Sequence, residues 1–117
     1  METLIEVNKK DVNGISIFSF NGELDETNAD KTFKSIYDQI GDFDGKNIIF
    51  NLGGLKYLNS KSIGYIADVF SNIEDEDGKM VISNCSDGVK DILELVGITT
   101  IIPTVDTEEE AIKLIKP

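Results

Sequence analysis

The residues that could do chemistry gather where the apolar run "NIIFNLGGLKYL" ends at Asn59 and Ser60 and a helical pattern begins. A serine hydroxyl can accept a phosphate, and the first turn of a helix has unpaired N–H groups and a positive dipole end that stabilise an anion. Lys61 would add a cation beside such a phosphate. Asn and Ser are also preferred helix N-caps. These residues therefore fit a helix cap or a phosphorylation switch, and both interpretations stay open.

A phosphate on Ser60 would act on a partner rather than on the fold. Phosphorylation adds roughly −1.5 to −2 charges. Burying that charge in an interface without a cation costs on the order of 3–5 kcal/mol, which is roughly two to three and a half powers of ten in affinity. Modification of Ser60 could therefore switch a complex off.

Residue type and spacing argue against other kinds of site, and a small enzyme or nucleotide-binding module is the least favoured interpretation. The sequence has no histidine, so it predicts no Ser-His or Cys-His nucleophile and no Cys/His zinc site. The glycine pair in "NLGGLK" lacks the spacing of a phosphate-binding or dinucleotide-binding loop. The acidic run "EDEDG", residues 74–78, lacks the spacing of a calcium loop. We expect no enzyme activity, no cofactor and no metal.

Composition narrows the partners and the location. The 117 residues fit one domain, residues 1–117, and 22 acidic against 11 basic residues give a formal charge of −11. Nucleic acid and anionic membranes reward basic patches, so neither is an expected partner. The acidic surface fits attraction of a basic partner or simple solvation. No apolar run reaches membrane-spanning length and no leader is visible, so a cytoplasmic protein is expected, with Cys85 a buried, reduced thiol.

The N-terminal half predicts a hairpin and a helix. The segment "GISIFSFNG", residues 14–22, reads as a strand paired with "TLIEV" through the turn "NKKDVNG". An amphipathic helix follows, and Thr27 with Asp30 resembles a capping box at its start. Its apolar stripe consists of Phe33, Ile36, Tyr37 and Ile40.

The central segment predicts a buried parallel strand followed by a second helix. Apolar residues in 47–55 do not alternate with polar ones, which is typical of a strand covered on both faces. In the helix that begins at Ser60, one face is apolar: Ile63, Ile66, Ala67, Phe70 and Ile73. The opposite face carries Lys61, Gly64, Tyr65, Asp68 and Asn72.

The C-terminal third continues the alternation of strands and helices. It predicts a strand at 79–83, a helix capped by Ser86 and ended by Gly97, a short strand at 98–103, and a last helix with Thr107 and Glu110 as a capping box. The fold class expected is α/β: a single domain with a mixed β-sheet and about four helices packed against it.

Three segments resemble the STAS domain of anti-sigma factor antagonists from bacterial partner-switching systems. They are "FNGELDETNADKTF", "NLGGLKYLNSKSIGYI" and "DILELVGITTIIPTVDTEEEAI". The family's central motif, approximately Asp-Ser-[Ser/Thr]-Gly-[Leu/Ile]-Gly, corresponds to residues 59–64: Ser60, Ile63 and Gly64 match it, whereas Asn59 replaces the acid and Ser62 the first glycine. Asn51 stands where the preceding strand of the family commonly carries an aspartate.

The resemblance implies partner exchange that controls transcription. The unphosphorylated domain would bind an anti-sigma factor that is also a serine kinase, phosphorylation at Ser60 would release it, and a serine phosphatase would reset the switch. Ser62 is a second candidate acceptor. Partner contacts are expected from Gly22, Glu23, Asp25, Asn59, Lys61, Gly64, Tyr65 and Asp68. The alternative is a STAS scaffold without phosphorylation, a regulatory subunit in a signalling or transport assembly.

Overall fold

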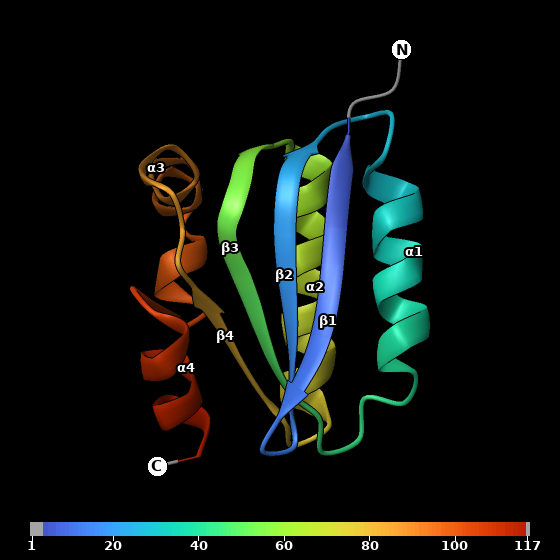
Figure 1. Cartoon of the computed structure of the whole chain (residues 1–117), viewed down its shortest axis with the longest axis vertical. Helices are drawn as coiled ribbons and strands as arrows, with labels where there is room; N and C mark the ends of the chain where they lie inside the picture. The colour runs from blue at the N-terminus through green and yellow to red at the C-terminus, as the bar shows by residue number, and fades with distance from the viewer. Residues whose placement is uncertain (1–3, 117) are drawn as a thin grey trace.

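One mixed β-sheet organises the molecule, with its five strands in the order β1-β2-β3-β4-β5 (Figure 1). The computed structural model describes residues 4–116. The α/β class with four α-helices, predicted from the sequence, is confirmed. The elements are β1 (Ile5–Val12), β2 (Ile15–Leu24), α1 (Ala29–Ile40), β3 (Asn47–Leu58), α2 (Ser60–Asp75), β4 (Lys79–Ser83), α3 (Asp87–Leu95), a 3₁₀ helix (Ile98–Thr100), β5 (Thr104–Val105) and α4 (Glu108–Ile115).

The predicted N-terminal hairpin is confirmed, but its turn is shorter than expected. β1 and β2 are antiparallel, with Val12 opposite Ile15. Asn13 and Gly14 between them have φ values of 52° and 79°, as a tight two-residue turn of the type I′ kind requires. Residues 8–12, which we expected in the turn, belong to the strand. The Asn-Gly pair was the stronger signal, and Thr3 of the predicted first strand lies outside the described residues.

The strands β2 to β5 run parallel, so their carboxyl ends meet at one edge of the sheet. Alternate residues of β3 face two separate cores. Phe50 packs with residues of α1, α2 and α3 on one face. Ile49 packs with Ala111 and Ile115 of α4 on the other face. The central strands are therefore covered on both sides, as their continuous apolar sequence indicated (Figure 1).

The short strand predicted at residues 98–103 is wrong. Gly97 has a φ of 84°, and the chain then forms a 3₁₀ turn in which the N–H groups of Ile101 and Ile102 donate to the carbonyl of Ile98 at 3.0 and 2.8 Å. This turn buries Ile98 and Ile102, which are spaced as on a helix. The last strand is only Thr104–Val105.

Side-chain caps form at the starts of two of the four α-helices for which the sequence predicted an N-cap. Thr107 caps α4, because its hydroxyl accepts a hydrogen bond from the Glu110 N–H at 3.1 Å. Asn59 caps α2, as described below. The capping box predicted for α1 is wrong: Asn28 is its N-cap and makes no side-chain cap bond. Ser86 precedes α3 as expected, but its hydroxyl donates to the Leu55 carbonyl at 3.0 Å instead of capping the helix.

Cys85, which follows β4 in the chain, is half-buried, and burial raises the pKa of its thiol to about 11. At neutral pH the thiol is therefore protonated, which makes it a poor nucleophile. Within residues 4–116, no helix has the length and apolar character needed to cross a membrane. The same residues contain no cluster of acidic or cysteine side chains arranged to hold a metal ion.

Candidate functional site

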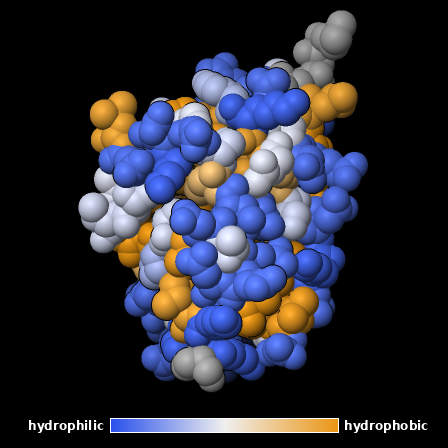
Figure 2. Space-filling view, turned by 60° about the vertical axis from the view of Figure 1, so that its left-hand side comes forward, coloured by the Kyte–Doolittle hydropathy of each residue, from blue (hydrophilic) through white to orange (hydrophobic). Residues whose placement is uncertain are grey.

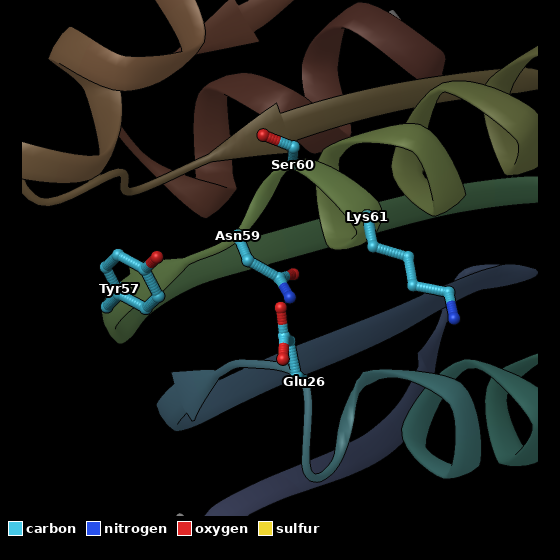
Figure 3. A pocket seen from close by; sticks show the side chains of 5 residues that line it. All are labelled: Glu26, Tyr57, Asn59, Ser60 and Lys61. Atoms are coloured by element: carbon cyan, nitrogen blue, oxygen red, sulfur yellow. The ribbon is translucent and has the colours of Figure 1, made fainter.

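The site expected around Ser60 lies at the carboxyl edge of the parallel strands, where the ends of β2 and β3 meet. The Asn59 N–H donates to the Leu24 carbonyl at 3.0 Å, which fixes the start of α2 beside the loop after β2. The two segments line a cavity of about 480 Å³ (Figure 3). Its walls are formed by Glu26, Tyr57, Asn59, Ser60 and Lys61. Crevices outside the carboxyl ends of parallel strands are the usual binding places in α/β folds.

Asn59, and not Ser60, is the cap of α2. Its Oδ1 accepts hydrogen bonds from the Ser62 N–H at 3.0 Å and from the Ser62 hydroxyl at 2.7 Å. Ser60 is the first helical residue, and its exposed hydroxyl has no hydrogen-bond partner among residues 4–116. In Figure 3 the Ser60 side chain points away from Asn59 and Lys61. Of the two roles left open by the sequence, the cap belongs to Asn59, and phosphorylation of Ser60 stays a prediction.

Ser62, the second candidate acceptor, is fully buried. Its hydroxyl is used in the bond to Asn59, so a kinase could reach it only after the first turn of α2 opens. Of the two serines, Ser60 alone presents a hydroxyl at the surface in the folded chain.

Replacing Asn59 tests this assignment of the cap. Asn59→Ala is expected to lower the free energy of unfolding by about 2 kcal/mol, because it removes the cap and leaves the buried Ser62 hydroxyl without its acceptor. Asn59→Asp keeps an oxygen in place and is expected to stay within about 0.5 kcal/mol of the wild type. Urea unfolding of both variants measures the difference. Equal stability of Asn59→Ala and the wild type would contradict the role of Asn59.

Lys61 pairs with the neighbouring helix rather than with Ser60. Its Nζ lies 2.8 Å from Asp30 Oδ1 in α1, and the Tyr65 hydroxyl donates to the same oxygen at 2.6 Å. Hydrogen bonds from Lys61 and Tyr65 hold the pKa of the Asp30 carboxyl below its usual value, and the bond to Asp30 raises the pKa of Lys61. From the sequence, Lys61 was expected to be the counter-ion of a phosphate on Ser60. The geometry does not favour this role, because Lys61 is paired with Asp30 and its side chain points away from Ser60 (Figure 3).

Two further residues of the predicted exposed face also tie α2 to α1. The Tyr65 ring is half-buried and stacks on Phe33, with centroids 4.8 Å apart. Asp68 is exposed and accepts hydrogen bonds from the Tyr37 hydroxyl and from Asn72 Nδ2. Gly64 differs from both, because a Cβ placed on it would meet nothing within 4 Å. The open part of this helix face is thus the part around Gly64.

The predicted loop residues mainly build the turn between β2 and α1. Asp25 Oδ1 accepts from the N–H and the hydroxyl of Thr27, at 2.8 and 2.7 Å. The buried Asn28 side chain donates to the Glu23 carbonyl at 2.9 Å. Glu23 itself is exposed. Gly22 lies inside β2 with a φ of 120°, and a Cβ there would stand 2.3 Å from the Leu4 carbonyl oxygen. Its residue type is therefore explained by backbone geometry.

The sequence interpretation missed two residues of the cavity, Glu26 and Tyr57. Tyr57 has 44% of its surface exposed although it lies in an apolar run. Leu55 and Leu58 are the buried residues on either side, and their spacing of three shows that strict alternation ends here. That spacing was a usable signal for Tyr57. Glu26 has no comparable signal: only the fold brings its side chain up to Asn59 (Figure 3).

Asn51 lies on the other face of the sheet and anchors α4. Its Nδ2 donates to Glu108 Oε1 at 3.0 Å, and its Oδ1 accepts from the Gly53 N–H at 2.9 Å. Lys10 Nζ lies 3.0 Å from Glu108 Oε2. Burial alone would raise the pKa of Glu108, but the bonds from Asn51 and Lys10 outweigh it and lower the pKa. An amide at position 51 therefore suits a carboxylate partner.

Comparison with known proteins shows what the sequence and the fold of the chain are similar to. The model of the STAS domain matches residues 6–111. The anti-sigma F factor antagonist of Paenibacillus polymyxa is 25% identical over 99 residues, which is 85% of each chain. The crystal structure of an anti-sigma factor antagonist from Mycobacterium paratuberculosis superposes with a TM-score of 0.87 at 19% identity, over 97% of this chain and 96% of that one. The Bacillus cell fate determinant SpoIIAA, in its phosphorylated form, has a TM-score of 0.71 at 21% identity, over 95% of this chain and 100% of that one.

Proposed function

The chain belongs to the STAS domain family, and from this premise we propose that it is an anti-sigma factor antagonist regulated at Ser60. In its unphosphorylated form it binds an anti-sigma factor with serine kinase activity and so frees a sigma factor. Phosphorylation of Ser60 releases the anti-sigma factor, and a serine phosphatase restores binding. The observation that carries the proposal is the exposed Ser60 hydroxyl, free of any bond to residues 4–116, at the first residue of α2.

The surroundings of Ser60 suit a switch that acts on a partner. At the start of α2 the Ser62 N–H is already bonded to Asn59, but the N–H groups of Ser60 and Lys61 and the positive end of the helix stabilise a phosphate, so phosphorylation leaves the fold intact. Glu26 and Lys61 both line this cavity, and Lys61 is already paired with Asp30. Among the residues that line the cavity, there is therefore no unpaired lysine to neutralise the charge of a phosphate on Ser60. A partner that covers the cavity meets that charge directly. The switch therefore works by repulsion and desolvation at the interface.

We infer that the partner covers the cavity and the open surface around Gly64. Ser60, Asn59 and Gly64 lie on the α2 side, with Glu23 and Asp25 on the loop side. Lys61, Tyr65 and Asp68 contribute mainly by holding α2 against α1. Tyr57, which is exposed in the cavity wall, joins this surface as an aromatic of the kind that anchors interfaces.

Gly64→Ala separates helix stability from partner binding. Alanine in place of glycine inside a helix is expected to raise the free energy of unfolding by about 0.5–1 kcal/mol, since there is open space for the methyl group. The same methyl group at a closely packed interface is expected to weaken partner binding at least about fivefold. Thermal unfolding and a binding titration measure the two effects. Unchanged affinity would place Gly64 outside the interface.

A second candidate is a STAS scaffold that binds its partner constitutively, as a subunit of a signalling or transport assembly. The observation that favours it is the chemistry of Asn59: its oxygen is occupied by Ser62, and it brings no carboxylate beside Ser60. A pull-down from an extract of the host, with and without phosphatase treatment, distinguishes the two. The switch predicts that phosphatase increases the anti-sigma factor captured. A scaffold predicts equal capture, and that outcome would refute regulation at Ser60.

A further inference from the structure

β1 is one of the two edge strands of the sheet, and within residues 4–116 only β2 pairs with it (Figure 1). It is eight residues long. A long unpaired edge presents a row of N–H and C=O groups that can pair with another strand. The question is whether the side chains of β1 block such pairing or select a particular partner.

The register of the hairpin decides which peptide groups point outward. The Glu23 N–H donates to the Leu4 carbonyl at 3.1 Å, and the pairing continues without a shift to Val12 opposite Ile15. In an antiparallel pair, alternate residues direct their peptide groups to the partner strand. Even-numbered residues of β1 therefore bond to β2. The residues that direct both N–H and C=O outward are Ile5, Val7, Lys9 and Asp11.

These outward groups allow a second β1 strand in antiparallel orientation, and side-chain charge selects the register. Outward residues must face outward residues, so the twofold axis passes through a residue rather than between two. With the axis at Asn8, all four outward residues are paired, and Lys10 of each copy stands opposite Glu6 of the other. These are non-hydrogen-bonded positions, where opposite side chains come closest.

The two neighbouring registers, with the axis at Lys9 or at Val7, are less favourable than the one centred on Asn8. With the axis at Lys9, the two copies of Lys9 face each other, and like charges directly opposite are destabilising. With the axis at Val7, Asp11 has no counterpart within β1 of the other copy. The register centred on Asn8 therefore combines the longest ladder with two pairs of opposite charge.

The charge of the edge also differs from that of the whole chain. β1 carries Glu6, Asp11, Lys9 and Lys10 and is neutral, whereas the chain has a formal charge of −11. The Lys10 side chain lies on the face of the sheet that α4 covers, and its Nζ is 3.0 Å from Glu108 Oε2. Asn8 Nδ2 donates to Glu6 Oε1 at 3.0 Å. Glu6 and Lys10 therefore extend along one face of the strand, as the cross-strand pairs require.

We propose that two copies of the chain pair through their β1 edges into one continuous sheet, antiparallel and centred on Asn8. Because β1 of one copy runs opposite to β1 of the other, the parallel strands of the two copies also run in opposite directions. The two helix starts at Ser60 then lie at opposite ends of the dimer, and each is free to bind its own partner. The dimer does not depend on phosphorylation or on the identity of the partner.

Sedimentation equilibrium at protein concentrations from micromolar to millimolar tests the pairing. The salt concentration is about 150 mM, so that repulsion between the acidic chains is screened beyond about 8 Å. We expect a dimer. Lys9→Pro removes an outward N–H that pairs twice in the dimer, and is expected to raise the dissociation constant at least about tenfold. Lys9→Ala, the matched control, keeps the N–H and is expected to stay within about threefold. A monomer at all concentrations overturns the proposal.

A charge swap tests the register itself. Lys10→Glu sets like charges opposite each other in both pairs and is expected to raise the dissociation constant about tenfold. Adding Glu6→Lys in the same chain restores opposite charges and is expected to bring the constant back within about threefold. Glu108→Gln controls for the loss of the pair between Lys10 and Glu108. If neither Lys9→Pro nor the charge reversal weakens the dimer, the dimer uses another surface, and this outcome also overturns the proposal. If Lys9→Pro fails to fold, the charge swap decides.

Discussion

Phosphorylation of Ser60 is expected to weaken binding of the anti-sigma factor by roughly two to three and a half powers of ten. The added charge of roughly −1.5 to −2 would be buried in an interface that must already cover Glu26. The cost is on the order of 3–5 kcal/mol when the partner supplies no cation, and each 1.4 kcal/mol or so is a factor of about ten. Lys61 offers little relief within the chain, because it is paired with Asp30.

Isothermal titration of the partner with phosphorylated and unphosphorylated chain measures this effect. Ser60→Ala is the control for loss of the hydroxyl and is expected to bind like the unphosphorylated chain, since the Ser60 hydroxyl makes no bond within residues 4–116. Ser60→Asp carries one charge and is expected to fall between the two. Equal affinity of the phosphorylated and unphosphorylated chains would remove the physical basis of the switch.

Gly22→Ala is expected to lower the free energy of unfolding by about 3 kcal/mol, the largest effect on stability among the site residues. Gly22 has a φ of 120°, a conformation that costs a residue with a Cβ of order 1–3 kcal/mol. The added Cβ would also stand 2.3 Å from the Leu4 carbonyl oxygen, so β1 would have to move. The expected fall in melting temperature is about 10 °C.

Thermal and urea unfolding of Gly22→Ala, with Gly64→Ala beside it, measure this difference. Gly64 has an ordinary helical backbone and open space around it, so the two glycine substitutions are expected to change stability in opposite directions. A Gly22→Ala variant within about 1 kcal/mol of the wild type would contradict the structural role. Loss of partner binding in this variant should be judged on the folded fraction, because a shifted β1 would also displace the loop after β2.

The sequence was most informative where local signals and the fold agree. Residues 106–116 contain a cap, acidic residues at the start and an apolar stripe, and α4 forms there. The apolar run of β3 indicated coverage on both faces, and two cores enclose it. Residues 98–103 show the opposite case. Their β-forming composition favoured a strand, but burial of Ile98 and Ile102 after the left-handed Gly97 gives a 3₁₀ turn.

The candidate site shows the same limit. Asn59 and Ser60 could be recognised as a helix start because N-cap residues have a local sequence signature. The sequence did not say which of the two is the cap, and the structure shows that it is Asn59. The pairing of Lys61 with Asp30 joins residues 31 positions apart, so no local pattern could reveal it. Glu26 reaches the cavity for the same reason: the ends of β2 and β3 are neighbours in the sheet.

The most direct test of regulation at Ser60 is the intact mass of the chain after incubation with ATP and the serine kinase that copurifies with it. The proposed function predicts the addition of a single phosphate, located on Ser60 by peptide mapping and absent in Ser60→Ala. No gain in mass with a kinase that binds the chain, or a phosphate that remains in Ser60→Ala, would contradict it.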